Sequence, residues 1–200
     1  TATTEIYTLS LHDALPISIV GTIIGMMTQT GVGTIFGSWI IGLGAKSLFL
    51  ALIMTMLLSI LLGTGIPTIP TYIITAALAA PALAKLGVPL IASHMFAFYY
   101  GIMADLSPPV ALAALAAAPI AKENPDKIGW EAMRIALAGY VIPFIFVYSP
   151  ALMLQGDSLL ATVYVGLKAL LAIGIWGAVF TGFLQAKLSW WERILGFAAG

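Results

Sequence analysis

The chain has 200 residues, of which 61% are hydrophobic and 8% are charged. Soluble domains carry about 25% charged residues, so this composition excludes an ordinary soluble domain and indicates an integral membrane protein. The formal net charge is zero, which gives no electrostatic basis for binding nucleic acid. There are no cysteines and only two histidines, His12 and His94, which excludes a disulfide framework and a zinc-thiolate site.

Residues 1–18 are polar, lack a helical period and have no basic n-region, so they do not form a signal peptide. They resemble, residue for residue, a one-frame translation of a widely used short-read sequencing adapter. This resemblance predicts that the natural protein begins near Ile19. A natural disordered N-terminus is the alternative, and we assign no role to His12 or Asp13.

Residues 19–45 form an apolar segment rich in glycine and threonine. A polar, flexible interruption at 25–33 divides the segment, so it is either one span or a helix and a half. Thr28, Gln29 and Thr30 lie in this interruption and form a weaker candidate binding site.

Two uncharged apolar runs, 48–62 and 72–84, flank a stretch at 63–71 that is rich in glycine, proline and threonine. In a bilayer, helix-breaking residues are tolerated only where the break is buried in protein or lines a water-filled cavity. Each run has about 14 residues, or about 21 Å of helix, which is short for a full span. We therefore predict a re-entrant helical hairpin over 48–85, with a single proline-kinked helix as the alternative.

The tip of this hairpin is the main candidate binding site. Its hydroxyl groups come from three threonines, and its two glycines permit close backbone approach or a positive φ. A lone threonine in a membrane helix commonly bonds a carbonyl of its own helix, but three around two prolines at a predicted break favour a site. The candidate residues are Gly63, Thr64, Gly65, Pro67, Thr68 and Thr71.

The segment 91–120 is also broken, at Asp105, Ser107, Pro108 and Pro109. Tandem prolines remove two N–H donors, and a proline pushes the residue before it out of the α region. Ser107 followed by Pro108 has the pattern of an N-cap with proline at the first position of a second half-helix.

Asp105 is the only acidic residue in the apolar part of the chain between Ile19 and Lys122. An ionisable residue inside the membrane is costly and marks a functional site by default. A broken helix supplies free carbonyls for a cation and a positive helix N-terminus for an anion. Asp105, Ser107 and nearby carbonyls are therefore expected to hold Na⁺ or a proton. The alternative is that Asp105 lies near the membrane surface and caps the break.

Beyond a charged loop at 122–127, residues 129–137 are mildly amphipathic and suit the membrane interface. Two further spans are predicted at 137–154 and 159–184, the second of which contains Lys168. Lysines inside a span snorkel or face the bundle.

The C-terminal end of the sequence has the pattern of a truncated membrane span. The apolar run that begins at 194 has seven residues, whereas a span needs about 20. The predicted organisation is an adapter-derived segment at 1–18, a part at 19–121 that holds the hairpin and the broken helix, and an interfacial helix with truncated spans at 122–200.

The distribution of basic residues predicts the orientation. If 48–85 is a hairpin, Lys46 and Lys85 share one side of the membrane. The other side carries Lys122, Lys127, Arg134, Lys187 and Arg193. This bias makes the loop 122–134 cytoplasmic and brings the hairpin in from the outside.

Several of these motifs resemble a known family. The stretches 63–68, 72–83, 98–114 and 143–152 are similar to the large membrane subunit of tripartite ATP-independent periplasmic (TRAP) transporters. The nearest branch is the fused permease served by TAXI-class binding proteins. The resemblance covers about 19–197 and departs from the family pattern at Thr64, where methionine is more usual.

The resemblance implies an elevator-type secondary transporter of the bacterial or archaeal inner membrane. Such a transporter uses Na⁺ to import organic acids delivered by a periplasmic binding protein. Its transport domain has two inverted repeats, each with a hairpin and a broken helix, and this chain would hold the second repeat. The remaining partners would be the first repeat and the small-subunit helices. No cofactor is implied beyond Na⁺, and the expected Na⁺ site comprises Gly63, Thr64, Thr68, Asp105 and Ser107.

Other functions are less consistent with the residues. An intramembrane enzyme needs a nucleophile–base pair or a metal cluster, and the sequence offers one credible histidine and one intramembrane aspartate. A channel or scaffold subunit does not require two paired helix breaks, whereas alternating access does. Another kind of ion-coupled secondary transporter is the alternative function that the residues still allow.

Overall fold

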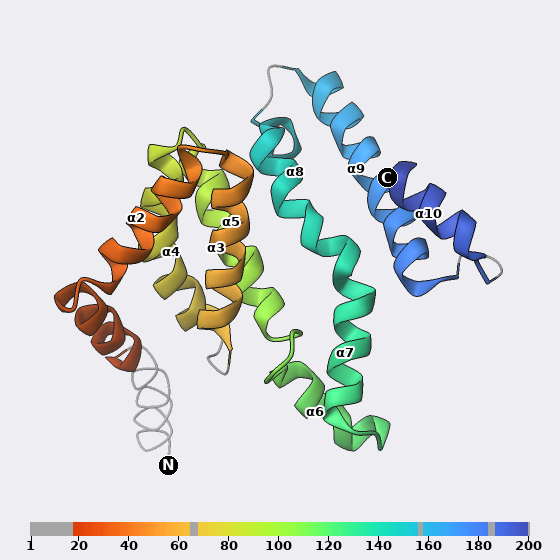
Figure 1. The fold of residues 1–200 in the computed structure, drawn as a ribbon, viewed down its shortest axis with the longest axis horizontal. Helices are drawn as coiled ribbons and strands as arrows, with labels where there is room; N and C mark the ends of the chain where they lie inside the picture. Colours follow the sequence, from red (N-terminus) through yellow and green to blue (C-terminus); the bar gives the residue numbers. More distant parts are fainter. Residues whose placement is uncertain (1–17, 65–67, 156–157, 184–186, 200) are drawn as a thin grey trace, which may run out of the picture.

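A computed structural model describes residues 18–64, 68–155, 158–183 and 187–199. These residues form helices and contain no β-strand, which confirms the prediction of an all-α membrane protein (Figure 1). The α-helices are Ser18–Gln29, α2 (Val32–Gly44), α3 (Leu48–Gly63), α4 (Thr68–Lys85), α5 (Leu90–Ala104), α6 (Leu112–Ala121), α7 (Pro125–Ala136), α8 (Ile142–Tyr148), α9 (Leu159–Thr181) and α10 (Trp190–Ala199). Two 3₁₀ segments, η1 (Leu137–Val141) and η2 (Pro150–Met153), flank α8.

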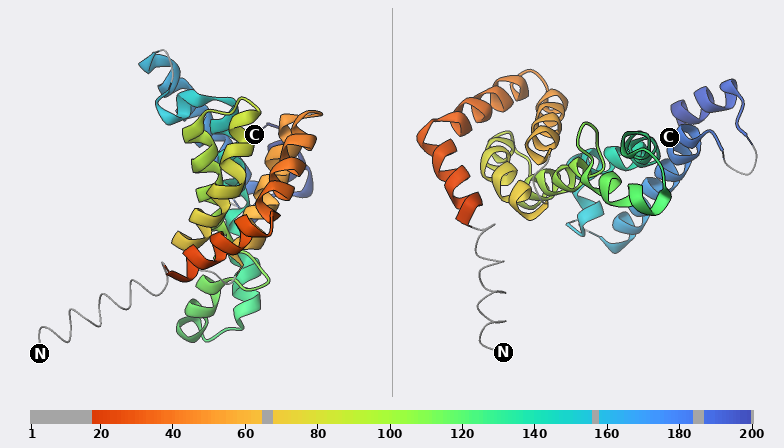
Figure 2. Two further views of the ribbon diagram at one scale, coloured as in Figure 1. Left: turned by 90° about the vertical axis from the view of Figure 1, so that its left-hand side faces the viewer. Right: turned by 90° about the horizontal axis from the view of Figure 1, so that it is seen from below.

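Helices α3 and α4 run in opposite directions and pack against each other, so 48–85 is a hairpin and not one kinked helix (Figures 1 and 2). The arms have 16 and 18 residues, or about 24 and 27 Å of helix, and are longer than predicted. Pro70 lies in the first turn of α4, where a missing N–H removes no helical bond. Gly63 is the last residue of the first arm, and Pro70 lies in the first turn of the second.

The core of the molecule lies where α5 packs against both arms of this hairpin. Many of its fully buried residues are small, including Ala51, Ala79, Ala92 and Ala97. Small side chains allow helix backbones to approach closely, and in lipid such packing replaces the hydrophobic effect as the source of association. The connections α2–α3 and α4–α5 lie at one end of this bundle and the hairpin tip at the other (Figure 1).

The first apolar segment is broken, as its polar interruption predicts. Helix Ser18–Gln29 meets α2 at an angle of 69°. Gly31 forms the corner with a φ of 70°, a left-handed conformation that glycine adopts without steric cost. The two pieces together are long and apolar enough for one bent span.

The second break falls between α5 and α6, as predicted, but the predicted helix start is wrong. Ser107 does not cap a helix, because α6 begins at Leu112 and its N-cap is Ala111. A proline disfavours the α conformation in the residue before it, so Pro109 opposes a helix start at Pro108. The peptide bond between these two prolines is cis.

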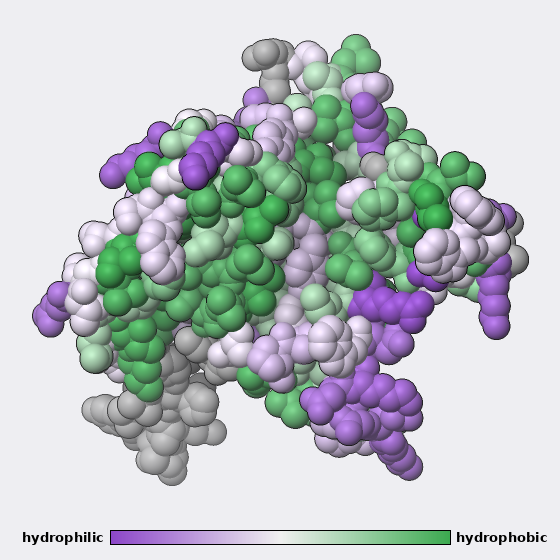
Figure 3. Space-filling view, viewed as in Figure 1, coloured by the Kyte–Doolittle hydropathy of each residue, from purple (hydrophilic) through white to green (hydrophobic). Residues whose placement is uncertain are grey.

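The predicted interfacial helix at 129–137 is not separate from the span that follows it. Helix α7 continues through η1 into α8, and Pro125–Tyr148 together are long and apolar enough to cross a membrane. Asn124 caps the start of α7 by accepting a 2.8 Å hydrogen bond from the Asp126 amide. Hydrophilic surface gathers at this end of α7, while hydrophobic surface covers much of α2 to α5 (Figure 3).

Helix α9 is the second candidate span and stands apart from the α3–α5 bundle, with α10 packed on it (Figure 2). Trp176 of α9 stacks on Phe197 of α10 with ring centroids 5.4 Å apart. Lys168 places its ammonium 5.3 Å from the centre of the Tyr164 ring, a cation–π contact that points the charge toward the N-terminal end of α9.

Candidate functional site

The candidate site lies where the tip of the hairpin meets the break after α5. Thr68 is the first residue of α4, and its hydroxyl donates a 2.7 Å hydrogen bond to Oδ2 of Asp105. Asp105 is the residue that ends α5. The two main predicted site regions are therefore joined directly, although 37 residues separate them in sequence.

Asp105 has a second oxygen that this contact leaves unsatisfied. Its Oδ1 atom is buried and has no hydrogen-bond partner in the described part of the chain. A buried carboxylate oxygen without a partner is costly, and such groups are normally balanced by a donor, a cation or water. The geometry therefore favours a cation or a proton at Oδ1.

Helix ends of both polarities lie around Asp105. Helices α3 and α5 both end here with their carbonyl groups, and helix C-termini carry partial negative charge. An acidic side chain at a helix C-terminus is unfavourable for the helix itself, so Asp105 opposes the dipole of α5. The N-terminus of α4, at Thr68, and that of α6, whose Ala113 amide bonds the Asp105 carbonyl, carry partial positive charge.

Gly63 allows the end of α3 to approach α5 this closely. A Cβ atom at Gly63 would lie 2.5 Å from the Cβ of Ala104 and 2.9 Å from Cγ2 of Thr71, well inside van der Waals contact. The absence of a side chain therefore sets the distance between hairpin tip and helix break. Thr71 itself is fully buried at this junction.

Thr64 does not share the contact that Thr68 makes with Asp105. The hydroxyl of Thr64 donates a 2.9 Å bond to the carbonyl of Ile60 in its own helix, so it does not reach across to Asp105. Gly65 and Pro67 lie outside the described residues.

The structure directs Ser107 away from Thr68. Its hydroxyl donates a 2.6 Å bond to the Met103 carbonyl and also bonds the Tyr140 hydroxyl. Pro108 lies beside the helix that contains Tyr140, since a Cβ added at Gly129 would lie 3.9 Å from the Pro108 Cγ. Pro109 completes the unwound turn.

The weaker candidates engage mainly in local contacts. Thr28 and Thr30 donate hydrogen bonds of 2.8 and 2.7 Å to carbonyls one turn back in their own helix. Thr28 also lines an open pocket of about 450 Å³ between α2 and α4. His94 packs against α4, with its Nδ1 atom 3.2 Å from the hydroxyl of Tyr72, as expected for a packed histidine.

A known protein family matches most of this chain. Residues 15–158 match the model of a family described as the DctM component of tripartite ATP-independent periplasmic transporters. The chain belongs to the DctM family. No curated protein and no solved structure gave a match.

The matched range contains the hairpin, the break after α5 and Pro125–Tyr148. DctM proteins are multi-pass permease components of secondary transporters, not a family of enzymes, and they work with a substrate-binding protein and a small membrane subunit. The match begins inside the segment 1–18 and ends at 158. The predicted start near Ile19 and the resemblance of 159–197 stay predictions.

The sequence did not predict the two tyrosines that contact the break after α5. Tyr140 bonds Ser107 through its hydroxyl and accepts a hydrogen bond from the Tyr100 hydroxyl through its carbonyl. Both are aromatic residues in apolar helices, where a packing role is the ordinary expectation. The one usable signal was the pair of prolines, which marks the end of α5 as a place where backbone groups need other partners.

Proposed function

We propose that this chain belongs to the permease of a Na⁺-coupled transporter that imports organic acids delivered by a periplasmic binding protein. The observation that carries the proposal is the bond between Thr68 and Asp105, which joins the start of α4, at the hairpin tip, to a carboxylate whose Oδ1 atom is buried. A ligand shifts a conformational equilibrium only if it binds one state better than the other. A cation that needs both the tip and the break would bind the closed state better and hold it.

The proposed Na⁺ ligands are oxygen atoms, as expected for a hard cation. Oδ1 of Asp105 supplies the charge, and the carbonyl groups at the end of α3 and the unwound turn supply further ligands. The residues proposed for this role are Gly63, Thr64, Thr68, Asp105 and Ser107. For Thr64 and Ser107 the ligand would be the backbone carbonyl. The hydroxyl of Thr64 is engaged with Ile60, and that of Ser107 with Met103 and Tyr140.

The substrate carboxylate is proposed to lie at the N-terminus of α4, near Pro67, Thr68 and Thr71. Helix N-termini bind anions through free N–H groups and a positive dipole. Asp105 lies close to this end of α4, and two carboxylates repel each other unless a cation or proton lies between them. Na⁺ at Asp105 would remove that repulsion, which gives a physical reason for symport.

The proposed surroundings follow the charge bias and the family. We place the permease in the inner membrane with the loop 122–134 in the cytoplasm and the hairpin entering from the outside as a re-entrant element. The second inverted repeat of an elevator domain would then lie in 19–121. Its partners would be a first repeat, the small-subunit helices and a periplasmic binding protein.

Uptake in proteoliposomes tests the proposal. The chain would be reconstituted with the rest of its permease and with the binding protein, and uptake of labelled organic acids measured under an inward Na⁺ gradient at equal pH. We expect uptake that needs both Na⁺ and the binding protein and is lost in Asp105→Asn. Uptake driven by a pH gradient without Na⁺ would replace Na⁺ with a proton as the coupling ion. Non-saturable flux without either gradient would indicate a channel.

A further inference from the structure

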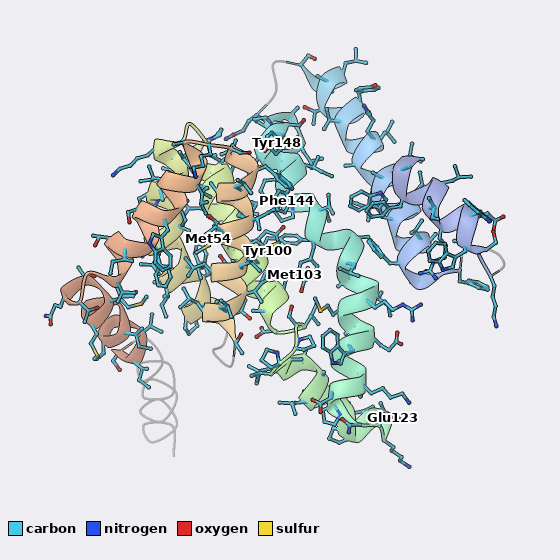
Figure 4. All side chains as sticks on the ribbon, in the orientation of Figure 1. Met54, Tyr100, Met103, Glu123, Phe144 and Tyr148 are labelled. Atoms are coloured by element: carbon cyan, nitrogen blue, oxygen red, sulfur yellow. The ribbon has the colours of Figure 1, made fainter. Side chains whose placement is uncertain are left out.

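A buried group of hydroxyls joins the break after α5 to the helix Pro125–Tyr148. Tyr140 lies in η1, in the middle of that helix. Its hydroxyl bonds the Ser107 hydroxyl and lies 3.5 Å from the Met103 carbonyl. Its carbonyl accepts a hydrogen bond from the Tyr100 hydroxyl. Tyr100 and Met103 lie on the side of α5 that faces this helix (Figure 4).

The tandem prolines leave the end of α5 with fewer backbone donors, because neither has an N–H. The Asp105 carbonyl accepts a 3.1 Å bond from the amide of Ala113, across the break. The Met103 carbonyl accepts a 3.1 Å bond from the Leu106 amide and a 2.6 Å bond from the Ser107 hydroxyl. The Ser107 hydroxyl therefore adds a side-chain bond to the backbone bonds that hold this turn.

These groups are inside the protein, so their hydrogen bonds are not exchanged with water. Tyr100 is fully buried, Ser107 is 4% exposed and Tyr140 is 9% exposed. Losing one partner of a buried pair leaves the other unsatisfied at a cost that water does not repay. The conformation of the turn at 105–107 therefore depends on the Tyr140 hydroxyl.

We infer that Tyr140 is a positioning residue for the cation site at Asp105. Its hydroxyl holds Ser107 and the end of α5, and thereby holds the Asp105 carboxylate two residues away in the orientation that meets Thr68. The inference rests on the proposed function, since it concerns the same site. It adds that the helix Pro125–Tyr148, which supplies no residue to the predicted site, sets the affinity of that site for its cation.

The structure provides a conservative variant and a matched control. Tyr140→Phe removes only the hydroxyl and keeps the ring, which packs 6.0 Å from the Tyr100 ring. Tyr100→Phe removes a hydrogen bond from the same interface, the one to the Tyr140 carbonyl, without touching the break. Both variants lose one buried hydroxyl, so a merely structural role would give them similar effects.

The test is a Na⁺ titration of the whole chain in nanodiscs at constant ionic strength, with K⁺ as the replacement ion. The readout is the Na⁺ concentration that gives half of the maximal thermal stabilisation, because a ligand that binds the folded state raises its stability. For Tyr140→Phe we expect this concentration to rise about fivefold, the effect of one lost hydrogen bond. For Tyr100→Phe we expect it to change less than about twofold, since its bond lies outside the turn.

Ser107 provides a second pair of variants should Tyr140→Phe fold poorly. Ser107→Ala should raise the half-maximal Na⁺ concentration as Tyr140→Phe does, and Ser107→Thr, which keeps the hydroxyl, should restore it. If both Tyr140→Phe and Ser107→Ala respond to Na⁺ like the wild type while Asp105→Asn does not respond at all, the inference is overturned and the proposed function stands. If Asp105→Asn also responds like the wild type, both fail.

Discussion

The Thr68 hydroxyl donates a 2.7 Å hydrogen bond to Oδ2 of Asp105, and this bond links the first residue of one hairpin arm to the end of a helix outside the hairpin. It satisfies one oxygen of a carboxylate whose other oxygen is buried without a partner in the described residues. The start of α4, at the hairpin tip, and the break after α5 are therefore in direct contact.

Replacing Thr68 tests this link. Thr68→Val keeps the branched shape and removes the donor, so Asp105 Oδ2 loses its partner and the tip loses its attachment. A hydrogen bond to a charged group contributes about 1.5–3 kcal/mol. We expect the Na⁺ concentration for half-maximal stabilisation to rise at least about tenfold, the equivalent of about 1.4 kcal/mol.

Thr68→Ser is the control for that variant, because serine keeps the hydroxyl. It should titrate with Na⁺ close to the wild type. Equal titration curves for the valine and serine variants would show that the hydroxyl has no part in the site.

The sequence predicted the parts of this site better than their contacts. Clusters of helix breakers in uncharged apolar segments locate interruptions, because lipid offers no partner to a free backbone group. Single prolines do not, since Pro81 and Pro119 lie inside α4 and α6. The breaks at 63–71 and after α5 were found for that reason. The contact of Tyr140 with Ser107 was not predictable, since it depends on how one helix is placed against another.

Local chemistry also misled the sequence analysis in two places. The Ser107–Pro108 pair has the pattern of an N-cap, but the second proline opposes a helix start there, and α6 begins at Leu112. Residues 129–137 are amphipathic, yet they continue into the next span because a 3₁₀ segment at Leu137–Val141 keeps the chain helical. In both cases the local structure depends on the residues that come after the pattern in the sequence.

Gly63 is predicted to be intolerant of even a methyl group. Gly63→Ala would place its Cβ 2.5 Å from the Cβ of Ala104, so the hairpin tip or α5 must shift. Overpacking of this kind costs about 1–3 kcal/mol. Thermal unfolding in detergent should show a lower midpoint, with weaker Na⁺ stabilisation because the site is displaced.

Gly42 provides the matched comparison within α2. A Cβ there would meet nothing within 4 Å, and alanine is favoured over glycine in a helix by about 1 kcal/mol. Gly42→Ala should therefore leave the midpoint unchanged or raise it. A midpoint for Gly63→Ala as high as that of Gly42→Ala would contradict the close approach of the two helices.

The start of α10 should depend on pH. The Ser189 amide donates a 2.7 Å hydrogen bond to the Glu192 carboxylate, and the Glu192 amide in turn donates a 3.4 Å bond to the Ser189 hydroxyl. The first of these bonds, with help from the serine side chain, lowers the pKa of Glu192 below its usual value. A lowered pKa in the folded state means that the stabilisation is complete above the unfolded pKa and is lost as the pH falls through the folded one.

Amide hydrogen exchange measures this effect. The protection factor of the Ser189 amide should be constant near neutral pH and fall in the acidic range below the ordinary glutamate pKa of about 4.3. Glu192→Gln should remove the pH dependence. A protection factor in the wild type that does not change across this range would refute the capping role.

The most direct measurement is equilibrium binding of ²²Na⁺ to the whole chain in nanodiscs. The wild type should bind Na⁺ saturably, Asp105→Asn should show no saturable binding, and Glu131→Gln, which removes an exposed acidic group from α7, should bind like the wild type. Saturable binding by Asp105→Asn with wild-type affinity would contradict the assignment of the cation site to the junction of hairpin tip and helix break.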